Sequence, residues 1–500
     1  MVEIETPQVL IDQTYKRAKE AFLKTRQLSL RERLKILSVI QKCILSRSED
    51  IVDRIIDETS KCRTDALVSE ILGVLDHLEY LKKNAEKILC DKKVKTPLTL
   101  MGKKSFISFE PLGVVLVISP WNYPFYLGLI PIISAFVAGN AVIYKPSEHT
   151  PLKGLIEKIL QESNMIKNAI QVVYGSGVTA QRLIQQRPAK IFFTGSVKTG
   201  KMVMEQASHY LIPVELELGG KDPMIVFDDI NLNRTTSGAL WGALTNCGQS
   251  CTSIERVYVH EIIYDDFVSM LEQKILELKI NEKSSMDTDV GGMTTKFQVD
   301  IVQKHIEDAK TKGARILTGG RSLTGSFAFL PTLMVNTDQS MDIMKEETFG
   351  PIIPVVKFRS EEEVVNEANN SPFGLSASVW SKDISRAKRV AKALNVGNVS
   401  INNVMLTEAN PALPFGGLKD SGFGRIKGKI GLIGFTSPKS ILMDKQSKKI
   451  EANWYPYTQK KYHLFQCLIH ALYDNTGIAR LLKVALSGLR LEAQAQKKRH

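Results

Sequence analysis

Residues 113–118 read GVVLVI, an unbroken run of apolar, mostly β-branched side chains that leads into the loop SPWN. A strand with both faces buried has this composition, whereas a half-exposed strand alternates apolar and polar residues. Similar runs return in NAVIYK (140–145), AIQVVYG (169–175) and KIFFTG (190–195), and a segment with helical spacing follows each of them. Such strands alternating with helices predict a parallel sheet that is covered on both faces.

A second run of the same texture begins near Lys221, with strands expected in PMIVF, ERVYVH, LPTLMV and PIIPVVKF. Residues 12–90 have helical spacing, and SFISFE alternates as a half-buried strand would. We therefore predict the α/β class, with two Rossmann-like, doubly wound parallel-sheet domains and a small bridging β element. The predicted ranges are 1–92 with 114–217 for the first domain, 93–113 with 438–445 for the bridging strands, 218–437 for the second domain and 446–500 for a basic extension.

Composition sets limits on the kind of protein. The chain has 500 residues, 43% of them hydrophobic, which is enough for a large core without disulfides. Six scattered cysteines and the acidic start MVEIETPQVL, which is unlike a signal peptide, predict a reducing, cytoplasmic location. Of the net charge of +13, an excess of +8 lies in residues 439–500, so the body is close to neutral. Nucleic-acid enzymes more often have a basic groove in the body, and no nucleic-acid partner is expected.

TNCGQSC (245–251) poses the main chemical question. Zinc is improbable, because there is no C-x-x-C and the nearest histidine is His260, so no metal is expected. A disulfide between Cys247 and Cys251 fits poorly with a reducing compartment. A buried inert cysteine and the nucleophile of a thiol enzyme both remain open.

Three further patterns are ambiguous when taken alone. Glu217, between leucines and before two glycines, is either a desolvated general base or a solvent-facing residue of an edge strand. Glu148 and Lys145 follow a buried strand and suit either a ribose or a surface ion pair. Gly195 and Gly200 suit either a local turn or a phosphate at a helix N-terminus.

Taken together, the motifs from about Phe106 to Ser437 resemble the aldehyde dehydrogenase superfamily. Seven of that family's motifs occur in the family's order: PWN (120–122), KPSE (145–148), FTGS (193–196), LELGGK (216–221), GQSC (248–251), EETFGP (346–351) and PFGG (414–417). Residues 111–125, PLGVVLVISPWNYPF, suggest the class-3 or fatty-aldehyde branch. The family's cofactor fold lacks the usual glycine triplet, and G-x-G-x-x-G is absent here too.

The resemblance implies roles for individual residues. Cys251 matches the nucleophile, Glu217 the general base and Asn122 the oxyanion donor. The implied cofactor is NAD, with NADP as the alternative, bound by the first domain. Its expected contacts are Pro120, Trp121, Lys145, Glu148, Gly195, Ser196, Gly200, Leu218, Glu347 and Phe349. An aldehyde adduct loses hydride rather than an amine, so the thiolate needs no paired histidine.

The implied reaction oxidises an aldehyde to the carboxylic acid through a thiohemiacetal and a thioester on Cys251, with hydride passing to NAD. We expect a medium- or long-chain aliphatic aldehyde, with semialdehyde or betaine-type aldehydes as alternatives. A cofactor-free thiol esterase and a catalytically silent structural protein are the rival classes. A homodimer or homotetramer is expected.

The C-terminal extension forms a separate question. In GIARLLKVALSGLRL, Ile478, Leu481, Leu482, Ala485 and Leu489 share one helical face, and Arg480, Lys483, Ser487 and Arg490 share the other. A basic amphipathic helix of this kind can lie peripherally on an anionic membrane surface. The alternative is a helix that packs on the body or on a partner subunit.

Overall fold

The computed structural model describes residues 5–100, 102–162, 169–281, 285–323, 326–444, 450–473 and 478–496. The chain forms two compact units, one made of Met1–Cys90 with Phe109–Pro438 and the other of Asp91–Ser108 with Lys439–His500. The fold is α/β, as predicted. The domain boundaries inferred from the sequence remain a prediction.

The first sheet of the larger unit has six strands in the order β17-β7-β6-β3-β4-β5. Its strands are β3 (Val114–Ile118), β4 (Ala141–Lys145), β5 (Ile170–Val172), β6 (Lys190–Thr194), β7 (Val214–Glu217) and β17 (Gly422–Phe423). All pair in parallel except β17, which runs antiparallel to β7. The register places Ile118 opposite Lys145 and Thr194 opposite Glu217, so these strand ends lie at one edge.

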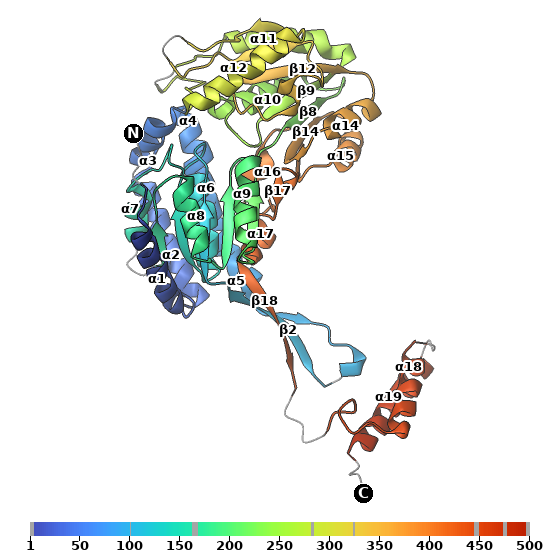
Figure 1. Ribbon diagram of the computed structural model, residues 1–500. Helices are drawn as coiled ribbons and strands as arrows, with labels where there is room; N and C mark the ends of the chain where they lie inside the picture. Colours follow the sequence, from blue (N-terminus) through green and yellow to red (C-terminus); the bar gives the residue numbers. More distant parts are fainter. Residues whose placement is uncertain are drawn as a thin grey trace. The chain divides into compact units, whose positions relative to one another are not determined.

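Successive side chains of β3 enter two different cores, as expected for a strand buried on both faces. Leu116 packs in a cluster with residues of α1 (Gln8–Thr25), α8 (Gly177–Gln185) and α9 (Val197–Ser208). Val115 and Val117 pack in another cluster with the helices of the opposite face (Figure 1). Those helices are α2 (Leu30–Ser46), α3 (Ser48–Thr59), α5 (Gly73–Leu89), α6 (Tyr126–Val137) and α7 (Leu155–Gln161).

One helix begins later than the sequence pattern suggests. The pattern of PSEHTPLKGLIEKILQE (146–162) predicts a helix that starts at Pro146, but α7 begins only at Leu155. Leu152 and Gly154 have φ of +44° and +81°, which interrupts a right-handed helix and delays its start.

The second sheet has seven strands in the order β10-β11-β12-β9-β8-β14-β15, and all pair in parallel except β10 with β11. The strands are β8 (Asp222–Val226), β9 (Ile254–His260), β10 (Arg315–Thr318), β11 (Thr332–Val335), β12 (Ile352–Phe358), β14 (Ser376–Trp380) and β15 (Asn398–Ile401). Its helices are α10 (Leu232–Leu244), α11 (Tyr264–Leu276), α12 (Lys296–Thr311), α13 (Asp342–Lys345), α14 (Glu361–Asn369) and α15 (Ile384–Ala393). Shorter elements complete the unit: α16 (Leu406–Ala409), α17 (Gly428–Gly434), and the pair β13 (Phe373–Gly374) with β16 (Leu418–Lys419).

The smaller unit contains a three-stranded sheet and two helices. The sheet order is β1 (Lys92–Val94), β2 (Lys104–Pro111) and β18 (Thr436–Met443), with β1 antiparallel to β2. The helices α18 (Gln459–Tyr473) and α19 (Ile478–Ala495) pack on each other. Lys103 forms ion pairs with Asp444 at 2.5 Å and with Glu451 at 2.6 Å, which join the start of the extension to the sheet.

Candidate active site

The cysteine loop follows α10 in an unusual backbone conformation. Asn246, Cys247 and Gly248 all have positive φ, at 51°, 56° and 72°. Two successive non-glycine residues in this region are costly, and such strain often gathers at functional sites. Asp65 holds the loop, because its carboxylate accepts from the Asn246 backbone N–H at 2.8 Å and from the Thr245 hydroxyl at 3.0 Å. The backbone therefore presents Cys251 in a fixed turn.

The three residues predicted to be catalytic line one cleft of about 1020 Å³. Asn122 follows β3, Glu217 ends β7 and Cys251 precedes β9. Nine of the ten predicted cofactor contacts line the same cleft: Pro120, Trp121, Lys145, Glu148, Gly195, Ser196, Leu218, Glu347 and Phe349. Gly200 is buried in α9, where an added Cβ would lie 2.6 Å from the Leu218 side chain, so it serves helix packing.

Glu217 is a buried carboxyl without a partner. Its side chain is only 5% exposed, and neither carboxyl oxygen has a hydrogen-bond partner among the described residues. Burial and the neighbouring Glu215 raise the pKa of Glu217 well above its ordinary value. β7 lies between β6 and β17, so the alternative of a solvent-facing Glu217 on an edge strand is wrong.

Cys251 is half-buried beside several carboxyl groups. Burial raises the pKa of its thiol, and the charges of Glu408 and Glu347 raise it further. The chain by itself therefore opposes the thiolate form, and a cation bound in the cleft would favour it.

Asn122 is tied to the cysteine loop. Its side-chain amide donates to the Gln249 carbonyl at 3.0 Å, and its own backbone carbonyl accepts from the Asn246 side chain at 3.0 Å. A side-chain amide has two N–H groups, so the second remains for another acceptor. The pairing of Asn122 with this loop places an N–H donor and the thiol on neighbouring segments.

The far part of the cleft fits a dinucleotide. Ser196 caps the N-terminus of α9, where backbone N–H groups can bind a phosphate. Lys145 Nζ lies 2.9 Å from a carboxylate oxygen of Glu148, at the edge where ribose hydroxyls bind in such sheets. Burial alone would raise the pKa of Glu148, but Lys145 and hydrogen bonds hold it below its ordinary value, so the group is anionic.

Glu347 and Phe349 lie at the opposite end of this cleft. Glu347 accepts from the Gly220 N–H at 3.1 Å, and burial raises the pKa of Glu347 to about 8. An added Cβ at Gly219 would lie 2.3 Å from the Glu347 carboxyl group, so a larger residue there would have to displace that carboxyl group. The Phe349 ring packs edge-on against Trp121, with 5.4 Å between centroids.

A second, narrow cavity, of about 30 Å³, adjoins Cys251 and Glu217, and both residues line it as well as the cleft. Most of its lining is apolar: Tyr126, Leu127, Ile130, Pro131, Phe192, Leu218, Leu375, Phe415 and Ile426. Besides Glu217, its charged residues are Glu408 and Lys427. The two reactive groups therefore line both the large cleft and the small apolar pocket.

Sequence reasoning missed Lys427. Its side chain is buried, with φ of +65° at the backbone, and its Nζ donates to the Glu408 carbonyl and lies 5.1 Å from the Tyr126 ring centroid. Burial lowers the pKa of Lys427, while Glu408, Glu217 and Cys251 counteract that shift. In the sequence it is one of two lysines in RIKGKIG, so no local signal separates it from a surface lysine.

Comparison with known proteins adds independent evidence. The model of the aldehyde dehydrogenase family matches residues 5–441. The chain is similar to 4,4'-diapolycopene aldehyde oxidase of Methylomonas sp, at 42% identity over 94% of this chain and 88% of the relative. It is also similar to 4,4'-diaponeurosporen-aldehyde dehydrogenase of Staphylococcus aureus, at 34% identity over 90% of this chain and 97% of the relative.

Among solved structures, betaine aldehyde dehydrogenase of Staphylococcus aureus in complex with NAD+ superimposes with a TM-score of 0.84. That match has 30% identity and covers 91% of this chain and 90% of the other. The two sequence relatives are named for carotenoid aldehydes, so they do not support the expected likeness to the class-3 or fatty-aldehyde branch.

Proposed function

Because this chain belongs to the aldehyde dehydrogenase family of NAD(P)-dependent oxidoreductases, we propose that Cys251, Asn122 and Glu217 together oxidise an aldehyde to its carboxylic acid. One observation carries this assignment. A thiol and a buried carboxyl that has no hydrogen-bond partner among the described residues line both a dinucleotide-sized cleft and an apolar pocket, and Asn122 lies beside them. A carboxylate in a surface ion pair and an inert cysteine in the core would not both line the same two cavities.

In the proposed reaction, Sγ of Cys251 bonds to the aldehyde carbon, and the carbonyl oxygen becomes an alkoxide that accepts from the Asn122 amide. One such donor contributes about 3–4 kcal/mol to the stability of the transition state. Hydride then leaves that carbon, and Cys251 becomes a thioester. NAD, when bound, supplies the hydride acceptor. Glu217 takes a proton from water, which attacks the thioester, and the acid departs as the thiol is restored.

We propose that the enzyme uses NAD in preference to NADP. Glu148 is anionic and would face a 2′-phosphate, while Lys145 beside it offsets part of the repulsion. We expect kcat/KM with NAD to exceed that with NADP by about tenfold, a difference of about 1.4 kcal/mol. Glu148→Gln should narrow this ratio, and equal efficiency of the wild type with both cofactors would contradict the proposal.

The substrate proposal is a long, apolar aldehyde, either aliphatic or polyene. The apolar lining of the pocket supports it, as do the carotenoid-aldehyde names of the two sequence relatives. A panel of aldehydes from short to long, followed by cofactor reduction, tests the assignment. Cofactor reduction rising with chain length is expected. Ester hydrolysis without cofactor reduction would instead support the thiol esterase.

A semialdehyde is the second candidate, and Lys427 is the observation that favours it, because a buried ammonium group can bind a carboxylate. The same cation disfavours a betaine-type aldehyde. If semialdehydes are substrates, Lys427→Met should raise their KM by about tenfold or more, since a charged hydrogen bond is worth about 1.5–3 kcal/mol. With a long apolar aldehyde as substrate, kcat/KM should change by less than about threefold. Measuring KM and kcat for both classes with both proteins separates the two.

We propose that the extension holds the enzyme on anionic membranes, where long aldehydes partition. Leu482, Leu486 and Leu489 of α19 are 62%, 53% and 63% exposed, although the helix packs on α18 and buries other residues such as Leu491 and Ala495. Leu482, Ala485 and Leu489 of the predicted apolar face are thus outward, while the side chains of Ile478, Arg480 and Leu481 lie outside the described residues. The same extension also has exposed aromatic residues: Trp454, Tyr455, Tyr457, Tyr462 and Tyr473.

The charge of the extension and the length of the helices favour binding at the membrane surface over crossing the bilayer. Residues 439–500 carry an excess of +8, and Lys or Arg near anionic lipid contributes about 1 kcal/mol each. In the described part of the chain, no helix has the length and apolarity needed to cross a bilayer. The alternative is that a second copy of the chain, in a homodimer or homotetramer, covers this exposed face of α19.

Truncation after Asp444 should abolish sedimentation with anionic vesicles at low salt and leave turnover of short aldehydes intact. A full-length protein in which Leu482, Leu486 and Leu489 are changed to serine should bind vesicles at least about tenfold more weakly. The matched control is Leu211→Ser, since Leu211 is 91% exposed but lies in the larger unit. Absence of vesicle binding by the full-length protein, or a change in its oligomeric state on truncation, would contradict the membrane proposal.

A further inference from the structure

A short segment between α3 and α5 carries two buried charged residues and one half-buried one that the proposed reaction does not use. Lys61 and Glu70 are ion-paired at 2.5 Å, and both side chains are 0% exposed. Asp65 lies between them in the chain, and Glu70 belongs to a π-helix that spans Ala66–Leu72. Burying an ion pair is unfavourable unless further hydrogen bonds compensate, and π-helical turns are frequent at functional sites.

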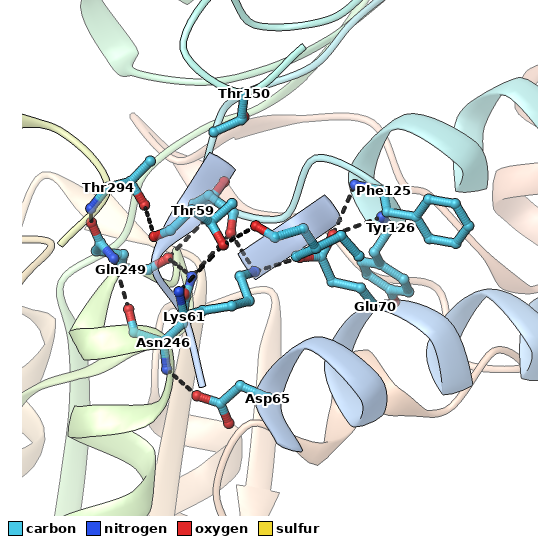
Figure 2. A network of polar contacts seen from close by, with 12 residues as sticks. Thr59, Lys61, Asp65, Glu70, Phe125, Tyr126, Thr150, Asn246, Gln249 and Thr294 are labelled. Carbon is cyan, nitrogen blue, oxygen red and sulfur yellow. Dashed lines mark hydrogen bonds and ion pairs between the residues drawn. The ribbon is translucent and has the colours of Figure 1, made fainter. Parts of the chain in front are cut away.

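The Lys61–Glu70 pair is bonded to the segment that carries the oxyanion donor. Lys61 Nζ donates to the Asn122 backbone carbonyl at 2.8 Å and lies 4.1 Å from the Tyr123 ring centroid. The second carboxyl oxygen of Glu70 accepts from the Phe125 N–H at 2.8 Å and from the Tyr126 N–H at 3.3 Å. Figure 2 shows Lys61 and Glu70 side by side, with Glu70 reaching the start of α6.

The same segment is bonded to the cysteine loop. Asp65 accepts from the Asn246 N–H, and the Asn246 side chain in turn donates to the carbonyls of Asn122 and Gln249 (Figure 2). The Thr294 hydroxyl donates to the Thr59 carbonyl at 2.9 Å, while the Thr294 N–H donates to the Gln249 side chain at 2.9 Å. Residues 59–70 thus contact both the donor segment and the nucleophile segment.

We propose that Lys61 and Glu70 are positioning residues, which hold the Asn122 amide where it meets the alkoxide formed on Cys251. The inference rests on the proposed function. Lys61 fixes the Asn122 peptide from one side, and the Asn246 side chain fixes the same carbonyl from the other. Because two donors hold this carbonyl, the Asn122 backbone cannot rotate and carry its side chain away. Small displacements of a catalytic group cost large factors in rate.

The test removes both charges at once, because leaving one buried charge without its partner could unfold the protein. In Lys61→Met with Glu70→Gln, the glutamine oxygen still accepts from the Phe125 and Tyr126 N–H groups, while the bond to the Asn122 carbonyl is lost. The readout is the pre-steady-state rate of cofactor reduction. The double variant should lose at least about tenfold in this rate, with NAD affinity unchanged.

Asn122→Ala provides the decisive background. If Lys61 and Glu70 act through Asn122, their substitutions should have little further effect once Asn122 is alanine. The triple variant should reduce cofactor less than about threefold more slowly than Asn122→Ala alone. The matched control is Lys221→Met with Glu255→Gln, another buried pair at 2.5 Å that contacts Thr348 on the cofactor side. These control substitutions should change the rate of cofactor reduction by the same factor in the wild type and in Asn122→Ala.

Each outcome decides one question. An equal loss from the Lys61 and Glu70 substitutions in both backgrounds, or no loss in either, would overturn the positioning role. Wild-type burst rates in Asn122→Ala would instead refute the role of Asn122 in the proposed function. An enzyme without any aldehyde-dependent cofactor reduction would refute that function altogether.

Discussion

Replacing Cys251 by alanine is expected to lower aldehyde-dependent cofactor reduction by at least about 10⁴-fold, because no other group can carry the covalent intermediate. NAD binding should persist, since the predicted cofactor contacts lie on other segments of the cleft. Steady-state turnover across the aldehyde panel and NAD titration by fluorescence measure the two effects. Loss of both together would point to a damaged fold rather than a missing nucleophile.

Cys247 is the matched control for that experiment. It lies four residues earlier in the same loop, is 1% exposed and packs in the core of the second sheet. Burial raises the pKa of its thiol, so it is a poor nucleophile. Its φ of +56° is equally unusual for alanine, so Cys247→Ala should retain activity within about twofold. An inactive Cys247→Ala protein with an active Cys251→Ala protein would reverse the assignment.

Glu217→Gln is expected to separate the two halves of the reaction. Hydride loss precedes the hydrolysis of the thioester, so a burst of reduced cofactor should survive. Turnover should fall by about 10²–10⁴-fold, which is the range for loss of a general base. Rapid-mixing measurements of the burst and the steady state give both values. Disappearance of the burst would place Glu217 in the first chemical step.

The pH profile gives an independent check on Glu217. Its pKa is raised by burial and by Glu215, so the carboxyl is protonated well above the usual range for glutamate. A general base acts only when deprotonated. Turnover should therefore rise with pH as the solution passes through this raised pKa, and the rising limb attributable to deacylation should vanish in Glu217→Gln. A wild-type profile that is flat from acidic to alkaline pH would contradict this role.

Much of the fold could be predicted from local patterns. GVVLVI becomes β3, and its alternating side chains enter two cores, because an apolar run without polar positions is stable only when both faces are covered. The loop that carries Asn122 could be placed at one sheet edge, since parallel strands end on the same side, whereas Glu217 could not be told from a residue of an exposed edge strand. Other features escaped prediction. The turn that delays α7 depends on backbone angles at Leu152 and Gly154 that composition does not specify.

The sequence by itself determined the α/β class, the strand and helix order and the motifs that bring Asn122, Glu217 and Cys251 together. Only the tertiary structure decided which charges are buried. Lys61 meets Asn122 and Lys427 enters the apolar pocket through packing between segments far apart in the chain. A lysine has the same local pattern on the surface and in the core, because burial is a property of its neighbours. For the same reason, a helical pattern gave α19 an apolar face but left open what that face contacts.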